Sequence, residues 1–284
     1  MVERNASTGR ILRPMLVVLL AVVTFGLPVF PQATISFERL PTTVIDHRLQ
    51  LVPSDNESRK EMLEDLFEES GCNAPQLVFQ DVKRSKLPNV VCTLPGTAES
   101  TIIVGAHFDR RGAGQGVADN WSGAALLPSI YQSLKNLSLK HTFVFVGFTD
   151  EEKGRIGSKF YAKSLKEEEV ALTSAMLNLD TLGLSSTKVW VSRSDPVLVT
   201  ALEALAGAMQ LPIDGMNMER VGSADSESFR KRDIPSMTIH SVTQENLTLL
   251  HSRADNLYAI QSEEYYRTYR LISAYLVYLD NVLD

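Results

Sequence analysis

The sequence lacks most features that would divide the chain or place it in an unusual class. Its 284 residues contain no internal repeat, no low-complexity segment and no linker rich in proline, glycine and serine. Beyond the N-terminus it has no run of lysine or arginine, and its net charge is −6. A basic face that follows nucleic-acid phosphates is therefore not expected. The length fits one large domain or two small ones, and the missing linker favours one.

Long apolar runs are also scarce. One such run extends from Met15 to Phe30, after Arg10 and Arg13. Its roughly 16 residues fall short of the roughly 20 that span a bilayer, and a glycine and a proline interrupt it. We therefore predict an export signal over residues 1–33, with an uncleaved anchor or a buried core helix as alternatives. The remaining domain, 34–284, would be secreted or periplasmic, and tethered to a membrane only if the segment is not cleaved.

Only two cysteines are present, Cys72 and Cys92. Neither has a cysteine or histidine nearby at metal-ligand spacing, so a zinc site built on thiolates is not expected. Each lies beside an expected strand, at 76–82 and 89–93, and these strands could pair as a hairpin. A disulfide in an oxidising compartment is one interpretation, and two separate buried thiols are the other.

Short apolar runs alternate with helical patterns along the rest of the chain. Runs this short, rich in β-branched and aromatic residues, predict strands that are covered on both faces. The alternation predicts an α/β fold with a mostly parallel mixed sheet and helices on both faces. The expected strands are Thr101–Ala106, Thr142–Phe148, Ala175–Leu179, Lys188–Ser192 and Pro235–Ile239. The expected helices are 54–71, 122–137, 158–165, 195–209, 226–231 and 262–283.

Ionisable residues follow these strands, at the edge where the sites of such folds form. If they converge, several carboxylates share one crevice, and dehydrating like charges together costs several kcal/mol per ion. Two divalent cations would balance four such charges. Imidazole and carboxylate ligands suit zinc, with cobalt or manganese as alternatives. The residues concerned are His107, Asp109, Asp119, Glu151, Glu152, Asp180 and His251.

Five motifs occur in a fixed order between Asn89 and Asp255. They are His-x-Asp from 107, Asp-Asn-x-Ser-Gly from 119, Glu-Glu-x-Gly-x-x-Gly-Ser from 151, Asn-x-Asp ending at 180, and His-Ser-x-x-Asp from 251. Together they resemble the co-catalytic di-zinc aminopeptidase family, which includes aminopeptidase Y and the secreted bacterial leucyl aminopeptidases. The resemblance implies a single zinc exopeptidase-like domain that releases N-terminal residues from peptides or proteins.

The resemblance also implies a role for each ligand. His107 and Asp180 would hold one zinc ion, and Glu152 and His251 the other. Asp119 would bridge the two ions, which gives two zinc ions per chain.

Further roles follow from the same resemblance. Asp109 would accept the free N–H of the histidine at 107 and so fix its tautomer. Asp255 would support the loop of the late histidine. Glu151 would act as the general base, taking the proton from a water that bridges the two ions. Two candidates for the substrate pocket come from position and not from the resemblance. They are Trp121, beside the expected bridging aspartate, and His240, which follows a strand and is alternatively a structural histidine.

Two positions depart from the family pattern, and other functions stay open. Trp121 stands where a small residue is expected, and Asp150 where glycine is frequent. One rival function is that of a glutaminyl-peptide cyclotransferase, which is expected to use one zinc ion. Others are a carboxypeptidase or amidase, and an exported domain that keeps the fold without catalysis. The sequence indicates neither the preferred side chain nor the oligomeric state.

Overall fold

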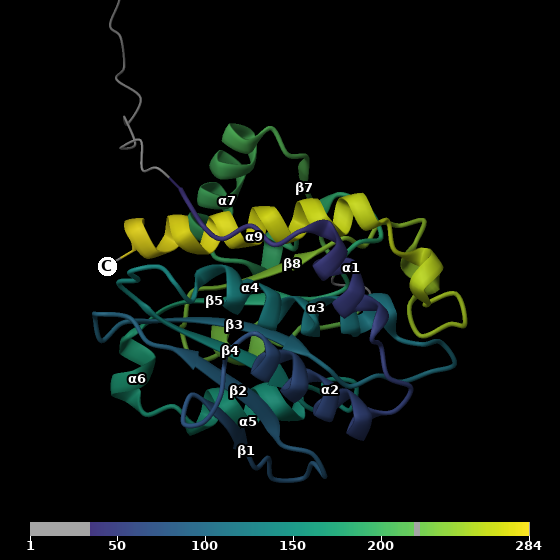
Figure 1. Cartoon of the computed structure of the whole chain (residues 1–284), viewed down its shortest axis with the longest axis horizontal. Helices are drawn as coiled ribbons and strands as arrows, with labels where there is room; N and C mark the ends of the chain where they lie inside the picture. The colour runs from purple at the N-terminus through teal and green to yellow at the C-terminus, as the bar shows by residue number, and fades with distance from the viewer. Residues whose placement is uncertain (1–34, 219–221, 284) are drawn as a thin grey trace, which may run out of the picture. The chain divides into compact units, whose positions relative to one another are not determined.

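The computed structural model describes residues 35–218 and 222–283 (Figure 1). The chain divides into residues 1–33 and 34–284, and only the second unit is described below. The predicted export signal therefore lies outside the described residues. Within the described part, no helix combines the length and apolar character needed to cross a bilayer.

The described unit is built on one eight-stranded sheet. The strand order is β1-β2-β4-β3-β5-β8-β6-β7. β3 pairs parallel with β4 and β5, as do β5 with β8 and β6 with β7, while β1–β2, β2–β4 and β6–β8 are antiparallel. This arrangement confirms the predicted mostly parallel mixed sheet. The strands are β1 Leu77–Gln80, β2 Asn89–Leu94, β3 Thr101–His107, β4 Thr142–Phe148, β5 Thr173–Leu179, β6 Thr187–Val189, β7 Ile213–Gly215 and β8 Ser236–His240.

Helices occupy most of the connections between the strands. The longer ones agree with the predicted ranges within a few residues. The predicted 122–137 helix is divided at Ala125, and α1, α6 and β7 were not expected. The helices are α1 Thr42–Gln50, α2 Asn56–Glu69, α3 Ser122–Ala124, α4 Leu126–Leu134, α5 Ile156–Ser164, α6 Glu167–Ala171, α7 Pro196–Met209, α8 Ser226–Arg230 and α9 Ser262–Val282.

The continuous apolar strands serve two cores because successive side chains point to opposite faces. On β3, Ile102 and Val104 pack into the larger core, and Ile103 packs into the smaller one. Helices α1, α2, α4, α7 and α9 contribute to the larger core, and α5 and α8 to the smaller one. Figure 1 shows α9, the long yellow helix, beside α1 and α7. Both faces of the central strands are therefore covered.

Cys72 and Cys92 form a disulfide. The bond joins the segment after α2 to β2, which pairs with β1 in the hairpin that the sequence suggested. Both side chains are fully buried. The bond thus lies at the β1 end of the sheet, two strands away from β3.

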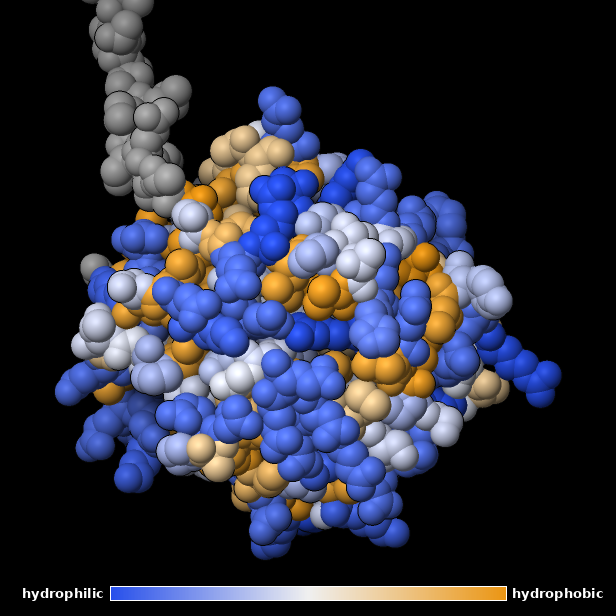
Figure 2. Space-filling model, viewed as in Figure 1, coloured by the Kyte–Doolittle hydropathy of each residue, from blue (hydrophilic) through white to orange (hydrophobic). Residues whose placement is uncertain are grey.

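The surface seen in Figure 2 is mostly hydrophilic, and its hydrophobic residues appear in separate groups. Scattered apolar residues are normal on a soluble surface and indicate no particular partner.

Candidate metal centre

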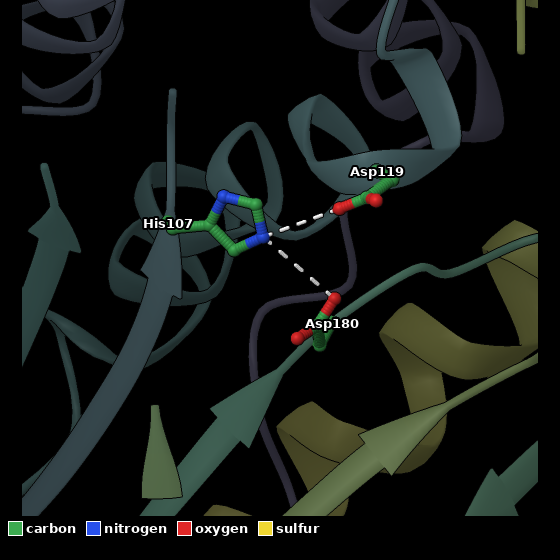
Figure 3. Close-up of side chains that lie close together, drawn as sticks. All are labelled: His107, Asp119 and Asp180. Atoms are coloured by element: carbon green, nitrogen blue, oxygen red, sulfur yellow. Dashed lines mark ion pairs between the residues drawn. The ribbon is translucent and has the colours of Figure 1, made fainter. Parts of the chain in front are cut away.

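Two clusters of metal-ligating side chains share the carboxyl edge of the sheet. The first consists of His107, Asp119 and Asp180, whose ligand atoms all lie within 4.8 Å of one another. In Figure 3 one ring nitrogen of His107 faces an oxygen of each carboxylate. His107 Nε2 lies 3.2 Å from Oδ1 of Asp119 and 3.8 Å from Oδ1 of Asp180. These three atoms could surround one cation.

The second cluster consists of Asp119, Glu152 and His251. His251 Nε2 lies 2.9 Å from Oε1 of Glu152 and 3.1 Å from Oδ2 of Asp119. Asp119 therefore belongs to both clusters and turns a different oxygen to each. The structure brings all five predicted ligands together, in the two sets that the family resemblance implied.

The parallel strands explain why residues so distant in sequence meet. His107 is the last residue of β3, and Asp180 directly follows the neighbouring strand β5. The glutamate pair follows β4, on the other side of β3. Asp150, which precedes that pair, has a φ of +52°, in the left-handed region where glycine is favoured. Glycine would adopt this conformation at lower cost, which fits the glycine that the resemblance led us to expect here.

Asp109 orients both His107 and the glutamate pair. The Nδ1–H of His107 donates to the main-chain oxygen of Asp109 at 3.1 Å, while the Asp109 carboxylate lies 3.4 Å away. That carboxylate accepts the backbone N–H groups of Glu151 and Glu152, at 2.9 and 3.2 Å. The carbonyl and the carboxylate of Asp109 thus both favour the predicted tautomer, with the proton on Nδ1. The carboxylate also fixes the turn that carries Glu151 and Glu152.

Asp255 ties its own segment, which begins at His251, to the loop of Asp119. Its two carboxylate oxygens accept the backbone N–H groups of Ala118 and Asp119, at 2.7 and 3.2 Å. That this side chain also supports His251 itself stays a prediction. The carboxylate reaches across to the bridging residue because the loop that bears Gly112 packs against the main chain of His251.

Asn120 belongs to the motif that begins at Asp119, but no role was predicted for it from the sequence. Its side-chain Oδ1 accepts from the backbone N–H of Gly123 and of Thr181, and its Nδ2 donates to Leu179 O at 2.8 Å. Leu179 and Thr181 flank Asp180, so this one amide links the loops of two ligands. Gly123 permits the approach, because an added Cβ would lie 2.5 Å from Leu179 O.

The electrostatics of the clusters favour cations. Burial and neighbouring negative charges raise the pKa of Glu151 to about 9 and the pKa of Glu152 to about 7. Burial also raises the pKa of Asp180. Burial opposes protonation of His107, yet hydrogen bonds to Asp109 and Asp119 raise its pKa well above the usual value. Without other cations, the cluster takes up protons.

The donor set fits two zinc ions. Each cluster offers one imidazole nitrogen and two carboxylate oxygens without a thiolate, as in catalytic zinc sites. Glu152 Oε1 is buried and accepts no hydrogen bond from the described residues, although His251 Nε2 lies 2.9 Å away, so both atoms can turn toward a shared cation. The acidic groups also outnumber the imidazoles, and divalent ions would relieve their mutual repulsion.

A cleft of about 250 Å³ opens over both clusters. Neither of the two candidate pocket residues lines it. Trp121 is fully buried, and its indole N–H donates to Arg48 O in the larger core. His240 is also fully buried, between Met216 O and the backbone N–H of Val242. Both pocket predictions are therefore wrong, because packing behind the strands turned these side chains away from the cleft.

Asp225 is a second residue that the sequence did not single out. It is fully buried before α8, and neither carboxylate oxygen has a hydrogen-bond partner in the described part of the chain. Burial raises the pKa of Asp225 to about 7, and its charge acts on Glu151. In the sequence it resembles an ordinary helix cap, so only its burial reveals it.

The chain matches a family model described as Peptidase family M28 over residues 89–276. It is 36% identical over 96 residues to a probable leucine aminopeptidase 2 of Trichophyton verrucosum (strain HKI 0517). That match covers 34% of this chain and 19% of the relative. The matched part of the chain thus spans about a fifth of the length of this curated relative.

Three solved structures share the fold at low sequence identity. The aminopeptidase LapA of Legionella pneumophila has a TM-score of 0.69 at 18% identity, covering 89% of this chain and 79% of LapA. A zinc aminopeptidase from Bacillus subtilis has a TM-score of 0.61 at 21% identity, and the match covers 67% of this chain and 49% of that enzyme. A glutaminyl cyclase from an Acidobacteriales bacterium has a TM-score of 0.72 at 15% identity, covering 88% and 97%.

Proposed function

The chain belongs to peptidase family M28, and we propose that it is a zinc-dependent aminopeptidase that releases N-terminal residues from peptides. The observation that carries the proposal is the pair of ligand clusters that share Asp119. The relative and two of the similar structures bear the name aminopeptidase, which supports the same reading.

Glu151 is the proposed general base. Zinc ions at the two clusters would polarise the scissile carbonyl and lower the pKa of a water molecule. Glu151 belongs to neither cluster but lines the same cleft, and its backbone N–H is held by Asp109. In the metal-free site burial raises the pKa of this carboxyl group to about 9, and bound divalent cations would lower that pKa again, so that the ionised carboxylate can accept a proton. We assign to it the transfer of a proton from the attacking water to the leaving amine.

The lining of the cleft also suggests that the N-terminal residue of the substrate has an apolar side chain. Beside the ionisable groups, it is lined by Trp190, Met218, Ala224 and Leu250. Side chains of this kind favour an apolar partner because its burial removes apolar surface from water. We therefore expect leucyl and methionyl substrates to be cleaved faster than lysyl or glutamyl substrates.

The role of Glu151 is tested by Glu151→Gln. We expect this variant to keep its zinc and to lose about 10²–10⁴-fold in kcat, because a positioned general base contributes that much. Metal content by elemental analysis and release of nitroaniline from leucine p-nitroanilide measure the two quantities. Full activity with bound zinc would refute the assignment.

A second candidate is a glutaminyl-peptide cyclotransferase. This chain covers 97% of the similar glutaminyl cyclase but only 49–79% of the two aminopeptidases. The two functions differ in stoichiometry and product. About two zinc ions per chain with hydrolysis of leucyl anilide supports the aminopeptidase, whereas one zinc ion with cyclisation of N-terminal glutamine supports the cyclotransferase.

Export is part of the proposal. The apolar run from Met15 to Phe30 is the basis for it, and the disulfide between Cys72 and Cys92 is compatible with an oxidising compartment. Expression of the full chain and N-terminal sequencing of the product would test it. We expect cleavage near residue 33, and an intact N-terminus on a membrane-bound product would indicate an anchor.

A further inference from the structure

Arg111 lies at the cleft with most of its donors free. Its side chain is 60% exposed. Among the residues that the structure describes, its guanidinium makes only long contacts, 3.5 Å to Oε2 and 3.5 Å to the main-chain oxygen of Glu152. The neighbouring Arg110 differs, because its guanidinium donates to the carbonyls of Ser54, Gly112 and Gly114. Arg110 therefore holds the loop together, whereas Arg111 is available to a ligand.

Arg111 carries the only permanent positive charge among the described residues that line the cleft. Its nearest acidic neighbour is Glu152, a member of the second cluster. Once a zinc ion balances that carboxylate, the charge of the arginine is no longer matched. An anionic group of a substrate then finds a guanidinium with several unused N–H donors.

The strand order places Arg111 at one end of the cleft. It contacts Glu152, which follows β4. Trp190 follows β6, which is antiparallel to β8, so its main chain lies beside Thr238 while the residue still lines the cleft. Strands β3, β5 and β8 lie between β4 and β6, so four strand spacings separate the two. At about 4.8 Å per spacing, the main chains of β4 and β6 are about 19 Å apart. The first ligand cluster lies between these ends, on β3 and β5.

This order gives a direction along which a peptide could lie in the cleft. A first residue whose apolar side chain lies at the Trp190 end places its carbonyl over the clusters. The second residue then extends toward Arg111. The cleft of about 250 Å³ is smaller than the roughly 300–1,000 Å³ of clefts that hold drug-sized ligands, so it has room for little more than these two residues.

We propose that Arg111 binds a carboxylate of the substrate's second residue and so directs the enzyme toward short or acidic peptides. The inference rests on the proposed aminopeptidase function. The carboxylate is either the free C-terminus of a dipeptide or the side chain of Asp or Glu in the second position. Both present two oxygens to the planar fork of an arginine.

The test compares substrates that differ only in charge. We expect the zinc-loaded wild type to cleave Leu-Gly with a kcat/KM about 10- to 100-fold above that for Leu-Gly amide, since hydrogen bonds to charged groups contribute that much. A preference for Leu-Glu amide over Leu-Gln amide would identify the side-chain carboxylate instead. Either preference supports the inference.

Variants show whether Arg111 is responsible. We expect Arg111→Ala to lose the preference, so that the ratio of kcat/KM for the charged and the uncharged peptide falls to about one, and Arg111→Lys to keep part of the preference. Arg253→Ala is the matched control, because it removes the same charge from an exposed position on a nearby loop outside the cleft lining. It should keep the full preference.

Two results would overturn the inference. One is a wild type that cleaves the charged and uncharged members of both pairs equally well. The other is a preference that survives in Arg111→Ala. Both differ from a failure of the proposed function, in which none of the four peptides is cleaved.

Discussion

Asn120 joins two ligand loops that lie far apart in the sequence. Replacing it by alanine leaves three buried backbone groups without partners, those of Leu179, Thr181 and Gly123. We expect Asn120→Ala to lower the free energy of unfolding by about 2–4 kcal/mol, because each unsatisfied buried group costs about 1–3 kcal/mol. Zinc affinity should fall as well, since the spacing of Asp119 and Asp180 is no longer held.

Urea unfolding and zinc titration of the purified variant measure these effects. Asn136→Ala is the matched control, because Asn136 is exposed and its amide donates only to a glutamate side chain. Equal zinc affinity in Asn120→Ala and the wild type would contradict the proposed link.

His240 gives a pH dependence of stability. Burial lowers its pKa to about 4, and Lys188 on β6, which pairs with it, acts in the same direction. Above pH 6.5 the imidazole is neutral in both the folded and the unfolded chain, so it has no effect. As the pH falls from 6.5 to 4 only the unfolded chain takes up the proton, and about 3 kcal/mol of stability is lost.

The check is the slope of the unfolding free energy against pH. In His240→Gln the slope between pH 6.5 and 4 should be shallower than in the wild type, whatever the absolute stability. Parallel curves for the two proteins would show that the histidine does not contribute.

The residue scale also shows what the sequence could and could not predict about the site. His107, Glu152 and Asp180 were predictable because a residue that follows a parallel strand lies at the carboxyl edge. The orientations of Trp121 and His240 were not, because they depend on packing against parts of the chain distant in sequence. Asp225 and Asn120 resemble ordinary helix-capping residues in the sequence. Only the structure shows that Asn120 has three buried hydrogen-bond partners and that the buried carboxylate of Asp225 has none among the described residues.

Among the elements, the disulfide connects the end of α2 to β2. It closes a loop with a sequence separation of 20 residues, which corresponds to about 3 kcal/mol of stability. We expect a reductant to lower the free energy of unfolding in urea by about this amount. Zinc content and activity in dilute urea should be unchanged, because the bond lies at the β1 end of the sheet.

The double variant Cys72→Ala/Cys92→Ala is the control for this experiment. Adding reductant to it should cause no further change. If the reductant destabilises both proteins equally, the effect comes from something other than the bond.

The elements that the sequence predicted share a property. β3, β4 and β5 are apolar on both faces, and Asp195 with Pro196 clearly marks the start of α7. The missed elements lack such signals: α6 has no buried residue, and β7 has three residues with partly or fully exposed side chains. Short elements of this kind depend on contacts with neighbouring parts of the fold, because their own sequences carry no clear hydrophobic pattern.

At the scale of the whole molecule, bound zinc should stabilise the fold. Ligands that bind only the folded chain add about 2.7 kcal/mol per site at a hundredfold excess over Kd. For a domain of this size, that corresponds to a rise in Tm of about 5–10 °C per site. Thermal scans with zinc and with a chelator measure the difference.

Asp119→Asn is the informative variant here, because Asp119 contributes an oxygen to both clusters. Most of the difference between zinc and chelator should disappear in it. A wild type whose Tm is the same with zinc and with chelator would contradict the proposed metal centre.

The support that Asp255 gives to Ala118 and Asp119 spans 137 positions of the chain. A chain that ends before Asp255 lacks the carboxylate that holds these two backbone groups. The position of the shared ligand therefore depends on a segment that is made long after it.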